Sequence, residues 1–269
     1  MEKLVFVKFG GSLITDKAQE ESLREGVLRR VAAEVAEASA RDSTLRLVVG
    51  HGSGSFGHVA AARFQTASGA AETAEWHGFA EVSDAAARLN AIVRAALRQA
   101  GVPALTLQPS ASAVCGDGVL EKLAYGPVRA ALEAGLVPLV YGDVAFDRVQ
   151  GSAIISTEQI LSFLARHLRP QWLLLAGETA GVLDDRDNVI PSITPRNLAA
   201  HRPALGGSRG TDVTGGMLTK VEQMLELVQA MPGVRVRIFS GLEPGALAKS
   251  LSGAGKGTVI SQGSATQSA

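Results

Sequence analysis

Most apolar segments of this 269-residue chain are short, and they are apolar at nearly every position rather than at every second one. That pattern is typical of strands covered on both faces, as in a parallel sheet between two layers of helices. Segments with helical spacing alternate with them, which predicts an α/β fold. The predicted strands are 4–9, 45–50, 103–107, 137–141, 171–176, 234–239 and 257–261.

The segments between these strands indicate the helices and the domain organisation. The predicted helices are 22–41, 80–100, 125–135, 156–168, 215–230 and 244–251. Residues 108–122 and 141–153 carry short Gly- and Asp-bearing stretches, which we interpret as hairpins beside the carboxyl edge of the sheet. No Pro/Gly/Ser-rich linker divides the chain and no repeat is evident, so we predict a single domain over residues 1–261. The polar tail 262–269 is predicted to be disordered.

Charge balance and cysteine content narrow the class of protein. Lys plus Arg and Asp plus Glu both number 26, so no net field attracts the chain to nucleic acid or to an anionic membrane. The apolar runs fall well short of about 18 residues, the length that a membrane-spanning helix needs. Cys115 is the only cysteine, which excludes an intrachain disulfide and fits a reducing compartment. Because the start lacks a signal-peptide pattern, we expect a cytoplasmic protein that binds neither nucleic acid nor membranes.

Two of the predicted strands end in glycine-rich loops. The strand 45–50 runs into Gly50–His58, where four glycines allow close approach to a ligand and Ser53, Ser55 and His58 add donors. The first strand contains Lys8 and ends in Gly10-Gly11-Ser12. Both loops are followed by helical patterns, so they predict two anion cradles. Two adjacent phosphate sites indicate transfer of a phosphoryl group between two ligands.

The spacing Gly52-x-Gly54-x-x-Gly57 also matches the dinucleotide-binding fingerprint. In a Rossmann unit that fingerprint closes the first strand, and an acidic residue ends the next strand about twenty positions on. Here the motif follows the second strand, and Glu72 and Glu75 lie in a region without a strand pattern. A dinucleotide-binding oxidoreductase therefore stays as the alternative from a different class of enzyme.

Three lysines lie near these and later glycines. Lys8 is inside an apolar strand, where an unpaired ammonium is costly; the glycines that follow favour a phosphate contact over a charge that extends into solvent. Lys17 is equally consistent with a phosphate contact and with a surface charge. Lys220 lies one turn into a helix that Asp212 or Thr214 could cap, and a well-capped helix without a ligand is the alternative there.

The remaining histidines carry no pattern of a metal site. Four lack the spacing of metal ligands and are interpreted as structural or solvated: His51, His77, His167 and His201. No complete P-loop motif occurs, and Gly255-Lys256-Gly257-Thr258 precedes the last strand rather than a helix, which indicates a turn. The sequence therefore names no metal ligand.

Four motifs occur in an order and at separations that resemble a known superfamily. They are Lys8-Phe-Gly10-Gly11-Ser12, His51-Gly-Ser-Gly54-Ser-Phe-Gly57-His58, Tyr141-Gly142-Asp143 and Thr211-Asp-Val-Thr-Gly-Gly-Met-Leu-Thr-Lys220. Together they resemble the amino acid kinase superfamily, most closely its isopentenyl phosphate kinase branch, from about Lys3 to Ile260. The Gly-Ser-Phe-Gly-His element distinguishes this branch from acetylglutamate and uridylate kinases, and fosfomycin-modifying kinases are its nearest competitor.

The resemblance implies a three-layer αβα sandwich with a central, mostly parallel sheet of about eight strands. It implies an acceptor-binding half over about 1–165 and a nucleotide-binding half over about 166–261. The implied activity is ATP-dependent phosphorylation of isopentenyl phosphate to isopentenyl diphosphate by a homodimer, with Mg²⁺ carried by ATP. A kinase for a phosphonate or another small phosphorylated acceptor is the alternative within the same class.

The resemblance also implies roles for individual residues. The implied catalytic residues are Lys8, Lys17, His58 and Glu158. The implied ATP-binding residues are Lys8, Gly10, Gly11, Ser12, Gly54, Gly177, Asp212, Gly216 and Lys220. The implied acceptor-binding residues are Ser53, Gly54, His58 and Gly142, and no residue is assigned to a metal.

The sequence departs from the family pattern at two places. Ser53 stands where the family has glycine, which narrows the loop or adds a hydroxyl contact. Thr157-Glu158 replaces the family's usual Gly-Asp, so the role of organising the lysines passes to a side chain one methylene longer. The hydrocarbon tail of isopentenyl phosphate needs an apolar pocket. The candidate residues for this pocket are Phe64, Trp76, Phe79 and Val82; for each of them, ordinary packing in a helix core is the alternative.

Overall fold

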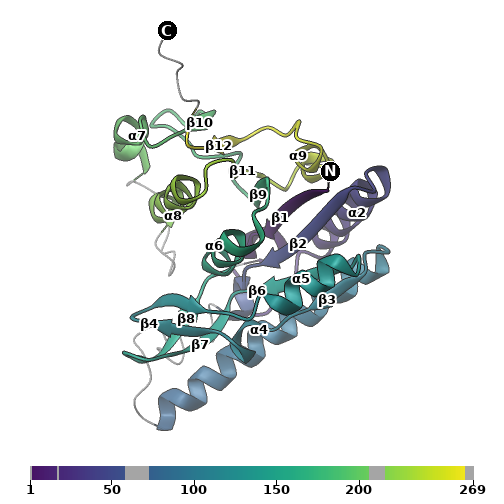
Figure 1. Ribbon diagram of the computed structural model, residues 1–269, viewed down its shortest axis with the longest axis vertical. Helices are drawn as coiled ribbons and strands as arrows, with labels where there is room; N and C mark the ends of the chain where they lie inside the picture. Colours follow the sequence, from purple (N-terminus) through teal and green to yellow (C-terminus); the bar gives the residue numbers. More distant parts are fainter. Residues whose placement is uncertain (1, 17, 58–72, 206–215, 264–269) are drawn as a thin grey trace.

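The computed structural model describes residues 2–16, 18–57, 73–205 and 216–263. Its centre is an eight-stranded sheet in the order β10-β12-β11-β9-β1-β2-β6-β3 (Figure 1). The strands of this sheet are β1 Lys3–Phe9, β2 Leu45–His51, β3 Ala104–Thr106, β6 Val137–Tyr141, β9 Trp172–Gly177, β10 Ser192–Ile193, β11 Arg235–Ser240 and β12 Thr258–Ile260. Only the β11–β12 pair is antiparallel.

Helices cover both faces of the sheet, so the predicted three-layer α/β arrangement is confirmed. The helices are α1 Gly11–Ile14, α2 Glu25–Arg41, α4 Thr73–Gln99, α5 Gly126–Glu133, α6 Thr157–Leu168, α7 Leu198–Leu205, α8 Gly216–Ala230 and α9 Ala246–Leu251, with a 3₁₀ turn η2 at Pro109–Ala111. Successive strand residues enter opposite cores: Val5 and Val7 pack with α2, α4 and α9, whereas Phe6 packs with α5, α6 and α8. This alternation across one sheet is why most strand positions are apolar.

A second, four-stranded sheet is formed by two strands that precede β6 and two that follow it. It has the order β5-β4-β7-β8, with β4 Val114–Gly116, β5 Val119–Lys122, β7 Asp143–Asp147 and β8 Gly151–Ile155. In Figure 1 it lies along the amino-terminal half of α4, where Val82 packs against Val144. The two predicted hairpin regions therefore supply β4–β5 and most of β7–β8, and they form one sheet.

The differences from the predicted elements have local causes. Sequence reasoning missed β10 and α1 because two and four residues carry no measurable period. It also missed α7, whose interior contains Pro203. The helix predicted from residue 80 begins at Thr73. None of the helices in the described part of the chain is both long and apolar enough to cross a membrane.

Candidate active site

The carboxyl ends of the central parallel strands meet at one edge of the sheet. The last residue of β1, Phe9, is paired with His51 at the end of β2 and with Ala176 on β9. On the other side of β2, His51 is paired with Tyr141, the last residue of β6. Ligands of open α/β sheets bind outside this edge, and the predicted glycine loops leave the sheet here.

Glu158 joins two of the predicted lysines at this edge. Its carboxylate oxygen Oε1 lies 2.5 Å from Nζ of Lys8 on β1 and 3.7 Å from Nζ of Lys220 on α8. Glu158 belongs to the first turn of α6, which a capping box between Ser156 and Gln159 fixes at its start. Three distant segments of the chain thus contribute to one cluster of charges.

The charge of Glu158 depends on its two cationic neighbours. Burial alone would raise the pKa of this carboxyl group, but the ammonium groups of Lys8 and Lys220 lower it to about 2. Glu158 is therefore ionised at neutral pH, and it keeps two cations side by side near the sheet edge. Such a pair can neutralise the phosphate oxygens of a ligand.

The two glycine loops touch each other through their backbones. The amide of Gly52 donates to the carbonyl of Phe9 at 3.0 Å. A Cβ atom on Gly11 would lie 2.5 Å from the amide nitrogen of Gly54, and Gly54 itself has a φ of 51°. Only glycine tolerates both constraints. The contact places the amides of the two loops beside each other, as two neighbouring anions would require.

Thr15 connects these loops, and sequence reasoning did not identify it. Its hydroxyl donates to the carbonyl of Gly11 at 2.8 Å and accepts from the amide of Ser55 at 3.0 Å. One buried hydroxyl therefore links the turn α1 to the helical turn after Gly54. A Thr directly after a short, unpredicted helix gives no sequence signal of this kind.

The predicted acceptor side is built around the carbonyl of His51. This oxygen accepts from the amide of Gly142 at 3.2 Å and from the hydroxyl of Thr157 at 2.7 Å. Gly142 thus lies beside the start of α6, next to the second glycine loop. Ser53 begins a helical turn in that loop, since its carbonyl accepts from the amide of Gly57 at 3.2 Å.

The predicted nucleotide side lies at the ends of β1, β9 and β11. The amide of Gly10 donates to the carbonyl of Ala176 at 2.7 Å, and the amide of Gly241 donates to the carbonyl of Gly177 at 2.8 Å. A Cβ atom on Gly241 would lie 2.7 Å from a methyl group of Leu13 in α1. The loop after β11 therefore packs directly behind α1.

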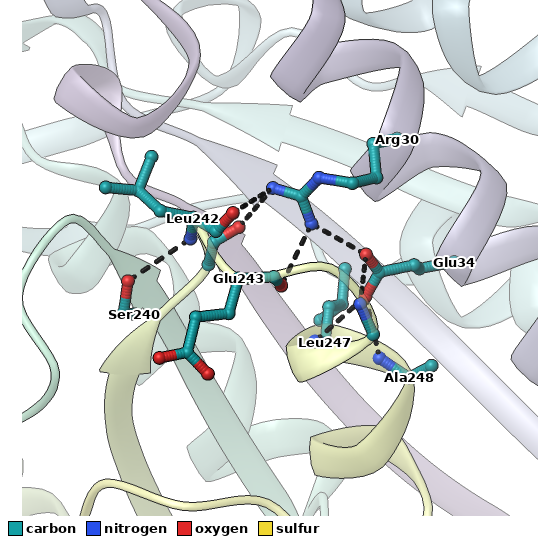
Figure 2. Close-up of polar contacts among 9 residues, drawn as sticks. Arg30, Glu34, Ser240, Leu242, Glu243, Leu247 and Ala248 are labelled. Atoms are coloured by element: carbon teal, nitrogen blue, oxygen red, sulfur yellow. Dashed lines mark hydrogen bonds and ion pairs between the residues drawn. The ribbon is translucent and has the colours of Figure 1, made fainter.

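Two residues of α2 hold that loop, as Figure 2 shows. The guanidinium group of Arg30 donates to three successive carbonyls and pairs with Glu34 at 2.7 Å. Its carbonyl partners are Gly241 at 2.6 Å, Leu242 at 3.1 Å and Glu243 at 3.2 Å. The Glu34 carboxylate accepts from three amides at the start of α9: Gly245 at 3.0 Å, Leu247 at 3.0 Å and Ala248 at 3.1 Å. This pair therefore holds the loop after β11, which packs behind the predicted nucleotide side.

The structure describes most of the predicted site residues. Those at or beside the sheet edge, or at the start of a helix that points to it, are Lys8, Gly10, Gly11, Ser12, Ser53, Gly54, Gly142, Glu158, Gly177, Gly216 and Lys220. Three others lie outside the described residues, and their roles stay predictions: Lys17, His58 and Asp212. Phe64, a candidate for the apolar pocket, lies outside them as well.

The other candidates for the apolar pocket contact the small sheet. The ring of Trp76 lies 5.5 Å from that of Phe79 and 5.9 Å from that of Phe146 on β7. Val82 is buried against Val144, which is ordinary core packing. Phe146 is 56% exposed, so the aromatic group forms an apolar rim between α4 and β7 rather than a closed core.

Metal ligands do not gather in the described part of the chain. No group of three or more His, Cys, Asp or Glu side chains there could hold a metal ion. The four structural histidines and Cys115 likewise form no such site among these residues.

Known proteins resemble this chain over almost its whole length. The sequence profile described as "Amino acid kinase family" matches residues 3–240. The isopentenyl phosphate kinase of Haloferax volcanii is 38% identical over 96% of this chain and 98% of the relative. That of Methanothermobacter thermautotrophicus is 32% identical over 93% and 96%, respectively. A solved isopentenyl phosphate kinase structure superposes with a TM-score of 0.76 at 30% identity, covering 96% of this chain and all of that one.

Proposed function

Because this chain belongs to the amino acid kinase family, we propose that it transfers the γ-phosphoryl group of ATP to isopentenyl phosphate and produces isopentenyl diphosphate. The curated relatives that match it at 30–38% identity over nearly the full length are isopentenyl phosphate kinases. The observation that carries the proposal is the contact between two glycine loops beside the Lys8–Glu158–Lys220 cluster. Family membership excludes the dinucleotide-binding oxidoreductase that the glycine spacing left open.

The reaction requires positioning and charge neutralisation more than proton transfer. A non-bridging oxygen of isopentenyl phosphate attacks the γ-phosphorus of ATP, and the bond from that phosphorus to the β–γ bridging oxygen breaks. ADP leaves with the electron pair. The attacking oxygen is already anionic, so no general base is needed. The protein must hold two mutually repelling anions in line and stabilise the equatorial oxygens.

The charge cluster and the first loop serve the nucleotide in this proposal. Lys8 and the amides of Gly10, Gly11 and Ser12 bind ATP phosphates, and Lys220 adds a second cation. Glu158 does not touch the phosphates; it fixes both ammonium groups. Gly177, Asp212 and Gly216 complete the nucleotide side, and Lys17 contacts the phosphoryl group in flight. The half of the chain beyond about residue 166 is then mainly nucleotide-binding.

The second loop serves the acceptor. Ser53, Gly54 and Gly142 surround its phosphate, and His58 donates a hydrogen bond to the phosphate that is not transferred. Gly54 lies between the two ligands because it contacts Gly11. The aromatic rim of Trp76, Phe79 and Phe146 offers apolar surface to the hydrocarbon tail, on the acceptor side of the sheet.

Mg²⁺, assembly and location complete the proposal. Mg²⁺ is carried by ATP and adds positive charge to the β- and γ-phosphates. A homodimer is supported by β3, which is an edge strand of the main sheet among the described residues and whose Leu105 is 40% exposed. Cys115 is a buried free thiol, and a cytoplasmic location is proposed because the chain has no second cysteine with which it could form an intrachain disulfide.

An ADP-release assay tests the activity. The purified protein is offered ATP, Mg²⁺ and, in parallel, isopentenyl phosphate, dimethylallyl phosphate, fosfomycin monophosphate and acetylglutamate. We expect turnover with the isoprenoid phosphates, loss of turnover in Lys8→Ala, and normal turnover in the exposed-site control Lys122→Ala. Turnover with fosfomycin monophosphate alone would transfer the assignment to a phosphonate kinase.

A further inference from the structure

A largely buried chain of hydrogen bonds runs from β3 through α4 to the second glycine loop. The hydroxyl of Thr106 donates to Oδ1 of Asn90 at 2.6 Å. The Nδ2 atom of this Asn lies 3.0 Å from Nε2 of His51, and Nδ1 of His51 lies 3.1 Å from the carbonyl oxygen of Gly52. His51 is fully buried and Asn90 is 3% exposed.

The partners at the two ends determine the state of the imidazole. A carbonyl oxygen only accepts, so Nδ1 of His51 must carry the proton. Nε2 then accepts from the Asn90 amide, whose oxygen is occupied by Thr106. Burial is the main cause that lowers the pKa of His51 to about 4; the hydrogen bond to Gly52 opposes it and the charge of Lys8 adds to it. The ring is therefore neutral under physiological conditions. One tautomer satisfies every group in the chain.

The same histidine is restrained on its other sides. Its ring stacks on Tyr141 at a centroid distance of 5.5 Å, and its carbonyl accepts from Gly142 and Thr157. His51 therefore connects β2, β6, α4 and α6 at the point where the second glycine loop begins. Both ring nitrogens are paired, as a buried imidazole requires, and these bonds hold the ring in one orientation.

We propose that His51 is a positioning residue for the acceptor: through the relay Thr106–Asn90–His51 it fixes the carbonyl of Gly52 and thereby the peptide plane that carries the amide of Ser53, which leads into Gly54. The inference rests on the proposed function, in which Ser53 and Gly54 surround the acceptor phosphate. Gly52 also contacts Gly11, yet the first loop has its own support from Ala176 and Thr15. A disturbed relay should therefore affect the acceptor more than ATP.

Two substitutions of His51 separate the hydrogen bond from packing. His51→Phe keeps a ring against Tyr141 but loses the donor to Gly52, whereas His51→Asn can place an amide donor near the position of Nδ1. We expect His51→Phe to raise KM for isopentenyl phosphate about 5- to 30-fold, as one buried hydrogen bond implies, with KM for ATP changed less than about twofold. His51→Asn should recover part of the loss.

Asn90→Leu tests the relay without altering the histidine. It removes the donor to Nε2, so KM for isopentenyl phosphate should rise in the same direction as in His51→Phe. The double variant should show less than the sum of the two effects, because both break one relay. His167→Phe is the matched control: His167 also stacks on a tyrosine, and its Nδ1 lies 2.9 Å from a backbone carbonyl, but on the exposed surface of α6.

A spectroscopic measurement keeps this inference separate from the activity. Nitrogen-15 NMR of the wild type should show His51 as the neutral Nδ1-protonated tautomer, whether or not isopentenyl phosphate is the acceptor, and Asn90→Leu should disturb that signal. An Nε2-protonated or charged His51 would overturn the proposal. So would equal rises of both KM values, or equal activity of His51→Phe and His51→Asn at equal thermal stability. A wild type inactive on every acceptor with the expected tautomer would refute the proposed function alone.

Discussion

Replacing Glu158 by Gln should destabilise the fold at neutral pH. The substitution keeps the shape of the side chain but removes the negative charge that lies 2.5 Å from Lys8 and 3.7 Å from Lys220. The pKa of Glu158 falls from its ordinary 4.5 to about 2 in the folded protein. At about 1.4 kcal/mol per pH unit, this fall corresponds to about 3 kcal/mol of folding free energy.

The sign of the pH dependence follows from linkage. The folded-state pKa is depressed, so the folded state favours the ionised carboxylate. The contribution is fully present above pH 4.5 and is lost as the pH falls from there towards 2. The stability difference between wild type and Glu158→Gln should therefore be about 3 kcal/mol at neutral pH and should shrink across this acidic range.

Urea unfolding of both proteins at a series of pH values measures this difference. Glu133→Gln, a charge removal at an exposed position of α5, is the control and should stay within about 0.5 kcal/mol of the wild type. Glu158→Gln should also lower kcat, because Lys8 and Lys220 then lose the carboxylate that holds both of them. If Glu158→Gln is as stable as the wild type at neutral pH, the cost of burying the carboxylate cancels the two ion pairs and the reasoning is wrong.

Three further predictions address other parts of the site. Lys17→Ala should lower kcat far more than it raises KM, because its contact forms chiefly in the transition state; steady-state kinetics with an unchanged kcat would make Lys17 a surface charge. His58→Ala should weaken use of isopentenyl phosphate about ten- to a hundredfold with KM for ATP nearly unchanged, and His58→Gln should retain part of the activity. Intact acceptor kinetics with lower thermal stability would instead indicate a helix cap. Glu34→Gln should lower the free energy of unfolding by about 1–3 kcal/mol in urea titrations, because it weakens three bonds to the start of α9, whereas the exposed Glu37→Gln should have little effect.

The central sheet was predictable because its strands are buried on both faces. Each predicted strand of the main sheet appears within about two residues of its expected bounds, an error usual for element ends. β10 could not be found, since it pairs only Ser192 and Ile193 with β12 and depends on that neighbour rather than on its own composition. The glycine loops could also be predicted from the sequence. The backbones of Gly11 and Gly54 lie so close together that only glycine fits at these positions.

The residues that hold the site in place could not be predicted, because their partners lie far away in the sequence. Arg30 and Glu34 have the spacing of any ion pair along a helix surface, and nothing in α2 shows that their partners lie more than two hundred positions away. His51 likewise could not be told apart in the sequence from the other histidines that lack a metal-ligand spacing. Its role depends on Asn90 of α4, which becomes its neighbour only after the layers pack.

Thr157-Glu158 stands where the sequence comparison with the family led us to expect Gly-Asp, and the structure shows how the two residues act together. The hydroxyl of Thr157 donates to the carbonyl of His51, and its methyl group lies 2.7 Å from where a Cβ atom on Gly50 would be. Thr157 thus occupies space that only glycine at position 50 leaves open. Glu158 follows directly and points to the lysines, so its longer side chain is carried by a helix start that Thr157 attaches to β2. The two substitutions form one unit: the threonine anchors the first turn of α6, and from that turn the glutamate reaches both Lys8 and Lys220.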